Sequence, residues 1–218
     1  VASFNQAFDW KIVTDGDGCW QSQKNQQGRE DFLQTGRYRI EEVQAPEGYL
    51  LSCLSEAVEF EIQQDQHTVI LTDCLKDQII RGGFTVQKQD EETVRPQGEA
   101  QLQTVFTLYN RSMHPVMVNG RTYDVDQAVD VDGDGDAYFT TDENGMYITG
   151  DHLLPYGSYE LVEVQAPVGY QIGNHASVSF SITSDGQMAD LTGKILDQVV
   201  TGKVILYKHL NARPSSEW

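Results

Sequence analysis

The chain has 218 residues and a formal net charge of −18, from 15 basic and 33 acidic side chains. A charge of this sign and size repels nucleic acid and anionic lipid, so neither is expected as a partner. Hydrophobic residues make up 39% of the chain, enough for a core, and no apolar run approaches the length of a membrane-spanning helix. No charged start followed by an apolar stretch is present, so the signal and anchor of a secreted parent would lie outside these residues.

Strand and turn residues dominate the composition. The chain has ten tyrosines and nineteen glycines, and pairs of threonine, valine and isoleucine recur along it. These residues favour strands joined by turns, and no stretch keeps an amphipathic helical period for longer than two turns. The sequence therefore predicts an all-β fold.

The N-terminal part of the chain, before Arg81, contains a turn signal, an apparent hairpin and all three cysteines. Thr14–Gly18 is the turn signal, and Ala57–Ile62 with Thr68–Leu71 reads as a hairpin flanked by Cys53 and Cys74. A Cys53–Cys74 disulfide is possible there, with reduced, buried cysteines as the alternative. One thiol is left over in either case, and no Cys/His spacing points to zinc.

Four alternating aspartates follow in the middle of the chain. They are Asp130, Asp132, Asp134 and Asp136, and the first three occupy positions 1, 3 and 5 of a calcium-loop pattern. The twelfth position is Thr141 rather than the bidentate glutamate that such a loop needs. We expect an acidic hairpin loop with weak or no calcium binding, and no other cofactor.

The sequence repeats itself with a period near 120. Gly36–Tyr49 (GRYRIEEVQAPEGY) matches Gly157–Tyr170 (GSYELVEVQAPVGY) at an offset of 121. Asp77 with the following Lys88 matches Asp197 with the following Lys208 at an offset of 120, so the spacing from aspartate to lysine is the same in both copies. The turn Thr14–Gly18 matches Thr141–Gly145 as a third pair in the same order. Repetition of this kind indicates tandem domains.

The repeat sets the expected boundaries. Residues 81–200 form one complete repeat, and residues 1–80 form a partial repeat that lacks its first strands. Residues 201–218 correspond to the first strand of a further repeat, or to a tail.

Three strands of the complete repeat each place an ionisable residue on an apolar face. Because side chains alternate along a strand, Lys88 shares a face with Phe84 and Val86. By the same alternation Glu163 lies with Tyr159 and Leu161, and Asp197 with Ile195 and Val199. Buried charges are costly unless they are paired, so this arrangement needs a cause.

Two explanations fit the alternation. The first is a buried salt bridge, or strand ends that emerge into solvent. The second is an amide bond between Lys88 Nζ and Asp197 Cγ, since an apolar site favours the neutral forms of both groups. Glu163 would then stabilise the tetrahedral intermediate and shuttle protons.

The Gly157–Tyr170 motif resembles the E-box of Cna B-type domains, the SpaA-like, prealbumin-fold domains of Gram-positive surface proteins and pilins. Gly83–Asp90 resembles the first strand of that family, and Val105–Asn110 its second strand. The resemblance implies tandem Ig-like, prealbumin-like β-sandwiches, with Lys88 as nucleophile, Asp197 as acceptor and Glu163 as catalyst of an isopeptide bond.

Half-sites remain at both ends of the chain. Glu42 and Asp77 match the catalyst and the acceptor, with Tyr38, Ile40, Leu75 and Ile79 on the same faces, while Lys208 has a suitable strand but no acceptor after it. One interpretation is that these residues were cut from a longer array. The alternative is that the Lys208 strand of one chain completes the first domain of another, with a Lys208–Asp77 bond.

The expected function is mechanical. The resemblance implies a stalk or shaft module of a cell-surface adhesin or pilus, extracellular and anchored to the cell wall, with neighbouring repeats as partners. A ligand-binding adhesin domain that recognises host protein or glycan is the alternative. No Ser/His/Asp constellation or phosphate loop occurs, so apart from one autocatalytic turnover no enzyme activity is expected.

Overall fold

The computed structural model describes residues 11–22, 33–51, 57–64, 68–72, 75–96 and 103–208. Every regular element in these ranges is a strand, which confirms the all-β prediction. None of the described residues belongs to a helix that could cross a membrane. Cys53 and Cys74 lie outside the described ranges, as does the disulfide predicted between them.

The chain divides into two compact units. Unit 1 comprises Val1–Ala45 and Leu51–Asp77, and unit 2 comprises Pro46–Leu50 and Gln78–Trp218.

Unit 1 contains an antiparallel pair of strands, β1 (Gly36–Ile40) and β3 (Val58–Ile62). Tyr38 stacks on Phe60 across this pair, with 5.4 Å between the ring centroids. The hairpin predicted between Ala57–Ile62 and Thr68–Leu71 is wrong, because Thr68–Leu71 forms no strand and β3 pairs with β1 instead. The apolar residues of Thr68–Leu71 suggest a strand, but their backbone has no ladder partner among the described residues.

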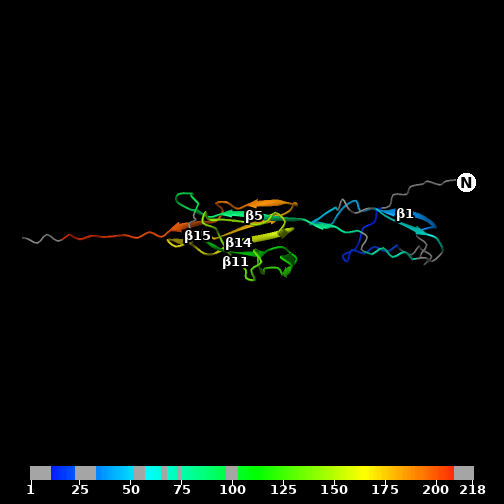
Figure 1. The fold of residues 1–218 in the computed structure, drawn as a ribbon, viewed down its shortest axis with the longest axis horizontal. Coiled ribbons are helices and arrows are strands. Elements are labelled where there is room, and N and C mark those ends of the chain that lie inside the picture. The colour runs from blue at the N-terminus through cyan, green and yellow to red at the C-terminus, as the bar shows by residue number, and fades with distance from the viewer. Residues whose placement is uncertain are drawn as a thin grey trace, which may run out of the picture. The chain divides into compact units, whose positions relative to one another are not determined.

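The larger sheet of unit 2 has five strands. It includes Tyr138–Thr140 and Gly157–Gln165, which Figure 1 labels β11 and β14. The five strands are β7 (Val105–Asn110), β10 (Ala128–Val129), β11 (Tyr138–Thr140), β14 (Gly157–Gln165) and β16 (Ser177–Ile182). β14 runs between β7 and β16, antiparallel to both. The E-box strand is therefore central to its sheet.

A second sheet is built around β5 (Arg81–Gln87). Its other strands are β12 (Met146–Ile148), β13 (Leu154–Pro155) and β17 (Gln187–Asp190). β12 and β13 pair with β5 in antiparallel fashion, whereas β17 pairs with it in parallel. β5, the strand that leads into Lys88, thus has partners on both sides.

Smaller pairings complete unit 2. β15 (Tyr170–His175) and β6 (Gln89–Asp90) flank β18 (Leu196–Val199), β2 (Tyr49–Leu50) pairs with β4 (Gln78–Ile79), and β8 (Val116–Val118) pairs with β9 (Arg121–Tyr123).

The two larger sheets of unit 2 pack face to face over an aromatic core. Phe84 of β5 contacts Phe180 of β16 at 5.5 Å and Phe139 of β11 at 6.0 Å between ring centroids. Phe84, Phe106 and Leu161 are fully buried. Apolar faces of two sheets that meet in this way define a β-sandwich, the architecture that the resemblance to Cna B-type domains implies.

Asn110 begins an Asn-Arg-Ser sequence, which matches the acceptor pattern for N-glycosylation. Its side chain is buried at the end of β7 and forms hydrogen bonds to the loops around it. Its Nδ2 donates to the carbonyls of His114, Tyr123 and Asp124 at 3.1–3.2 Å, and its Oδ1 accepts from Ser112 N at 2.9 Å. An amide with all its atoms used in this way is closed to glycosylation in the folded domain.

We expect Asn110→Ala to lower the free energy of unfolding by about 2 kcal/mol, because it leaves buried carbonyls and an amide without partners. Denaturant unfolding measures the loss. The exposed Asn174 supplies the control, since Asn174→Ala should change the midpoint little. Equal midpoints for the two variants would contradict the role given to the Asn110 side chain.

Candidate isopeptide site

Lys88, Glu163 and Asp197 lie on or directly after strands of three different sheets of unit 2. Lys88 directly follows β5, and its backbone N donates to Gly145 O at 2.8 Å. Glu163 lies on β14 opposite Phe106 of β7, and Asp197 lies on β18. Each strand turns alternate residues inward, so all three side chains point into the core.

The three side chains meet in the interior. Lys88 Nζ lies 3.0 Å from Glu163 Oε2 and 2.8 Å from Asp197 Oδ1, and all three side chains are fully shielded from solvent. These contacts are ion pairs at short range, and the Lys88 nitrogen and all four carboxylate oxygens are buried without a hydrogen bond of good geometry among the described residues.

The electrostatics of this group are dominated by burial. Burial raises the pKa of Glu163, the nearby Lys88 ammonium lowers it and the Asp197 carboxylate raises it, and the net result is a pKa of about 7. Near neutral pH Glu163 can therefore either hold a proton or release one.

A short strand at the end of the predicted Gly83–Asp90 segment lies beside the acceptor. β6 pairs in parallel with β18, placing Asp90 opposite Asp197, and Glu91 N donates to Asp197 O at 2.9 Å. Tyr170 lies opposite Val199 on the other side of β18, and burial and the charges of Asp90 and Asp197 raise the pKa of its phenol. A strand of two residues is too short to show an alternating pattern. In the sequence, only Tyr170 of the E-box could have indicated that this region belongs to the site.

The half-site carboxylates in unit 1 also lie together. Burial raises the pKa of Glu42, and hydrogen bonding to Asp77 and the charge of Asp77 add to the shift. Leu75 and Ile79, expected on the same face as Asp77, are both exposed.

Lys208 lies in a segment of unit 2 that forms no strand, and it is exposed. The structure therefore places it with no carboxylate partner among the described residues. Cys19, the third cysteine, is exposed and free.

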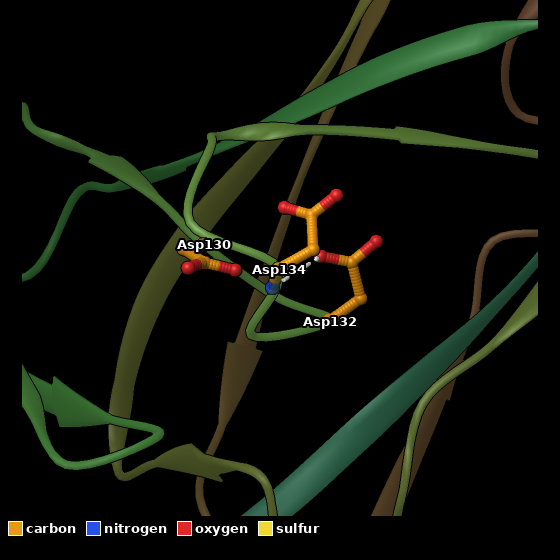
Figure 2. A group of neighbouring side chains, drawn as sticks. All are labelled: Asp130, Asp132 and Asp134. Atoms are coloured by element: carbon orange, nitrogen blue, oxygen red, sulfur yellow. Dashed lines mark hydrogen bonds between the residues drawn. The ribbon is translucent and has the colours of Figure 1, made fainter.

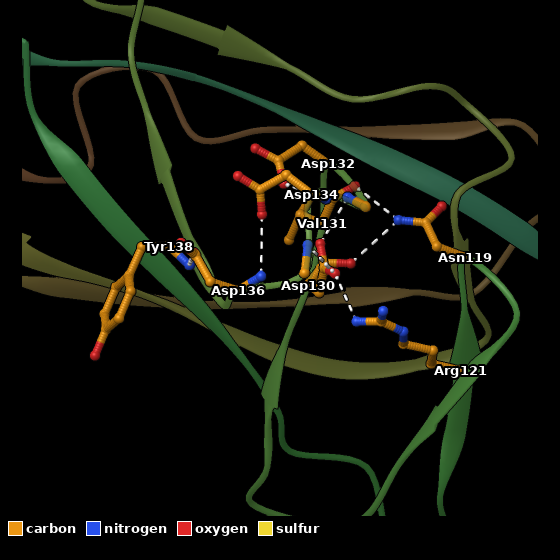
Figure 3. Close-up of polar contacts among 10 residues, drawn as sticks. Asn119, Arg121, Asp130, Val131, Asp132, Asp134, Asp136 and Tyr138 are labelled. Carbon is orange, nitrogen blue, oxygen red and sulfur yellow. Dashed lines mark hydrogen bonds and ion pairs between the residues drawn. The ribbon is translucent and has the colours of Figure 1, made fainter.

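The acidic loop folds around its own aspartates. Asp130 is buried, and its carboxylate accepts from the backbone N of Gly133 at 2.6 Å and of Gly135 at 3.0 Å, with Arg121 Nη1 at 3.2 Å (Figure 3). Figure 2 shows Asp132 and Asp134 beside it. Both are exposed, and one oxygen of each of the three aspartates lies within 4.8 Å of the others.

Asp136 stands apart from this group, because its carboxylate accepts from Tyr138 N at 2.6 Å. Weak or no calcium binding at Asp130, Asp132, Asp134 and Asp136 stays a prediction.

Comparison with known proteins gives two kinds of match. The model of the SpaA prealbumin-like fold domain family matches residues 7–74 and 82–195, which is more than half of the chain. No curated protein sequence matches.

Solved structures match as well. The chain is 26% identical to the Bacillus anthracis TIE protein, over 77% of this chain and 26% of that chain, with a TM-score of 0.53. It is 25% identical to a streptococcal ancillary pilin, over 77% of this chain and 43% of that one, with a TM-score of 0.38. It is 22% identical to GBS52, the minor pilin of Streptococcus agalactiae, over 85% of this chain and 70% of that one, with a TM-score of 0.39.

The chain therefore spans about a quarter of the first of these proteins and less than half of the second. The fold agrees with the family match, since the TIE protein superposes at a TM-score above 0.5. From the match over both segments, the chain belongs to the SpaA prealbumin-like fold domain family.

Proposed function

We propose that this chain is a load-bearing shaft or stalk module of a Gram-positive cell-surface pilus or adhesin, and that unit 2 locks itself with a Lys88–Asp197 isopeptide bond. Membership of the SpaA prealbumin-like fold domain family supports the role as a shaft or stalk module, and the pilins among the similar structures support a place in a pilus or adhesin. The partners would be neighbouring repeats or other subunits of the same assembly, outside the cell.

The observation that carries the proposal is the buried group of Lys88, Glu163 and Asp197. In a salt bridge that is fully buried, the charged atoms are normally also hydrogen-bonded, because otherwise nothing compensates for their lost hydration. Here Lys88 Nζ lies 2.8–3.0 Å from one oxygen of each carboxylate, and neither the nitrogen nor any of the four carboxylate oxygens has a hydrogen bond of good geometry to a described residue. Such a cluster is costly as a set of ions and favourable as a neutral amide.

The chemistry follows from these positions. Neutral Lys88 Nζ attacks Cγ of protonated Asp197, and Glu163 takes one proton from the nitrogen. Glu163 then delivers a proton to the hydroxyl of the tetrahedral intermediate, which leaves as water. A C–N amide bond forms and a C–O bond breaks, with Glu163 returned to its starting state. A pKa of about 7 suits both transfers.

The position of the bond supports a mechanical role. Lys88 follows the first strand of the sandwich and Asp197 lies on the last, so the amide would join the two ends of unit 2. Force applied along the chain would then pass through covalent bonds and bypass the ladders between strands.

Intact mass spectrometry of the monomer tests the proposal. The wild-type chain should be lighter than its sequence by one water, and Glu163→Gln and Lys88→Arg should each restore the full mass. Glu160→Gln is the matched control, since Glu160 lies on the same strand but is partly exposed and pairs with Arg111 at 2.8 Å. A wild-type chain of full mass would refute the bond.

A further inference from the structure

The residues that directly follow Lys88 hold the strand that carries its acceptor. β6 begins at the next residue and pairs in parallel with β18, which places Asp90 opposite Asp197. Immediately after β6, Glu91 N donates to Asp197 O at 2.9 Å. The amide that holds the acceptor backbone therefore comes three residues after the lysine, in the same segment of chain.

A single turn follows β6, and the Asp90 carboxylate caps it. Asp90 Oδ1 accepts from Glu92 N at 2.8 Å and from Thr93 N at 2.7 Å, and Val94 N donates to Asp90 O at 2.9 Å. These are the bonds of an N-cap residue, whose side-chain oxygen accepts from the second and third amides of the turn. The first amide, that of Glu91, has no acceptor within such a turn and bonds β18 instead.

The turn contains a strained residue that the Asp90 bonds must hold in place. Val94 has a φ of 53°, in the left-handed region that β-branched residues avoid. Strain of this kind persists only where surrounding contacts fix the backbone. Asp90 supplies such contacts through its side chain and its own backbone, since Asp90 N also donates to Arg95 O at 3.1 Å. Loss of the Asp90 carboxylate should therefore let the turn open.

Asp90 lies beside the reacting group without belonging to it. Its side chain is buried, with 6% of the residue exposed, and the Thr93 amide lowers the pKa of its carboxyl more than burial raises it. Lys88 pairs with Glu163 and Asp197 instead. A buried carboxylate that the bond chemistry does not use, and that accepts from backbone amides, is suited to placing the backbone.

The other edge of β18 holds the acceptor less regularly. β15 places Ile172 opposite Asp197, but its ladder with β18 shifts register between Ile172 and His175. The bond from Glu91 N therefore fixes the Asp197 backbone on the side from which the lysine comes. A shift of about 1 Å in the acceptor is enough to lose attack geometry.

We propose that Asp90 is a positioning residue for the Lys88–Asp197 bond: its carboxylate folds the turn that directs the Glu91 amide at the Asp197 carbonyl, and so keeps the acceptor within reach of the lysine. Asp90 neither attacks nor transfers a proton. This inference rests on the bond proposed for unit 2 and names the contact that sets its geometry. Lysine and acceptor are then aligned by a few neighbouring residues.

The rate of bond formation in the full chain tests this role, followed by intact mass after cell-free synthesis. Asp90→Ala should slow the loss of water by about 10–100-fold, since a misplacement of about 1 Å costs up to about 100-fold. Asp90→Asn should keep most of the rate, because asparagine caps a turn as well as aspartate does. Asp190→Ala is the control: Asp190 Oδ1 also accepts from an amide, Thr192 N at 2.9 Å, but its strand β17 pairs with β5 and not with β18.

Substitution of Glu91 separates the amide from the fold of the turn, and serves also if Asp90→Ala fails to fold. Proline fits the first position after a cap but has no N–H, so Glu91→Pro keeps the turn and removes the bond to Asp197 O. It should slow bond formation as Asp90→Ala does. Glu91→Ala keeps the N–H and should react like the wild type.

Hydrogen exchange gives a readout that does not depend on the reaction. In the Glu163→Gln background, where no bond forms, Asp90→Ala should speed exchange of the Glu91 amide by about tenfold, the worth of one hydrogen bond. The Lys88 amide bonds Gly145 O at 2.8 Å and should exchange as before. Equal acceleration of both amides would mean that Asp90 serves general stability, and would overturn the positioning role.

The mass data separate this inference from the proposed function. A wild-type chain of full mass refutes the bond and this inference with it. If the wild type loses one water and Asp90→Ala or Glu91→Pro chains lose it equally fast, only the positioning role is overturned. Asp90→Asn chains as slow as Asp90→Ala chains overturn it as well, because the charge of Asp90 and not its cap would then be needed.

Discussion

Glu163→Gln is expected to lower the melting temperature of unit 2 by roughly 15 °C and to let the unit extend under force. A link between Lys88 and Asp197 closes a loop of about 110 residues, and by analogy with a disulfide over such a loop it contributes about 5 kcal/mol. That free energy corresponds to roughly 15 °C for a domain of this size. Calorimetry of the whole chain measures the shift.

The mechanical difference should be larger than the thermal one. In a chain pulled between its ends, the wild-type bond withholds about 110 residues from extension, a length on the order of 350–400 Å. Glu163→Gln should release this length in one step, and the wild type should show no such step. A release of the same length by the wild type would contradict the bond.

The substitution also changes a buried carboxylate, so its effect must be separated from the effect of the bond. Lys88→Met prevents the bond by itself, and adding Glu163→Gln to Lys88→Met should then cost little or even stabilise, since a buried unpaired carboxylate is removed. If Glu163→Gln costs as much in the Lys88→Met background as in the wild type, its effect comes from packing alone.

The strands that carry the site are predictable because their alternation is strong. Phe84, Val86 and Lys88 are all buried, as are Tyr159, Leu161 and Glu163, so a period of two is enough to place the ionisable groups inward. The repeat then gives each of these residues a counterpart at an offset of 120 or 121. Two independent regularities in the same residues make the sequence informative at this site.

Other features depend on contacts that leave no periodic signal. β6 contains only Gln89 and Asp90, and Thr68–Leu71 resembles a strand but lacks a ladder partner among the described residues. The parallel pairing of β17 with β5 joins segments from opposite ends of the repeat, which no local pattern encodes. The acidic loop resembles a cation site, yet its buried Asp130 is used by backbone amides of the same loop.

The sequence also does not show that neighbouring segments approach β5 closely, apart from the adjacent glycines Gly82 and Gly83. Gly83 lies where a Cβ would collide with Gly150 O and Thr149 Oγ1 and would come within 2.9 Å of Met188 Sδ. Two of these atoms belong to the β12 side and one to β17, so β5 is held from both directions. The backbone oxygen cannot move aside without displacing the turn that contains it.

Gly83→Ala should therefore destabilise unit 2 by about 3 kcal/mol or more, through overpacking against the Gly150 carbonyl. It should also slow formation of the bond, because a shift of β5 moves Lys88 away from Asp197, and near-attack geometry tolerates about 1 Å or less. Denaturant unfolding in the Glu163→Gln background measures the first effect, and the fraction of bonded mass over time measures the second.

Gly150→Ala is the matched control, since a Cβ there meets nothing within 4 Å. If Gly83→Ala chains fold and cross-link like Gly150→Ala chains, close packing on β5 does not position the lysine.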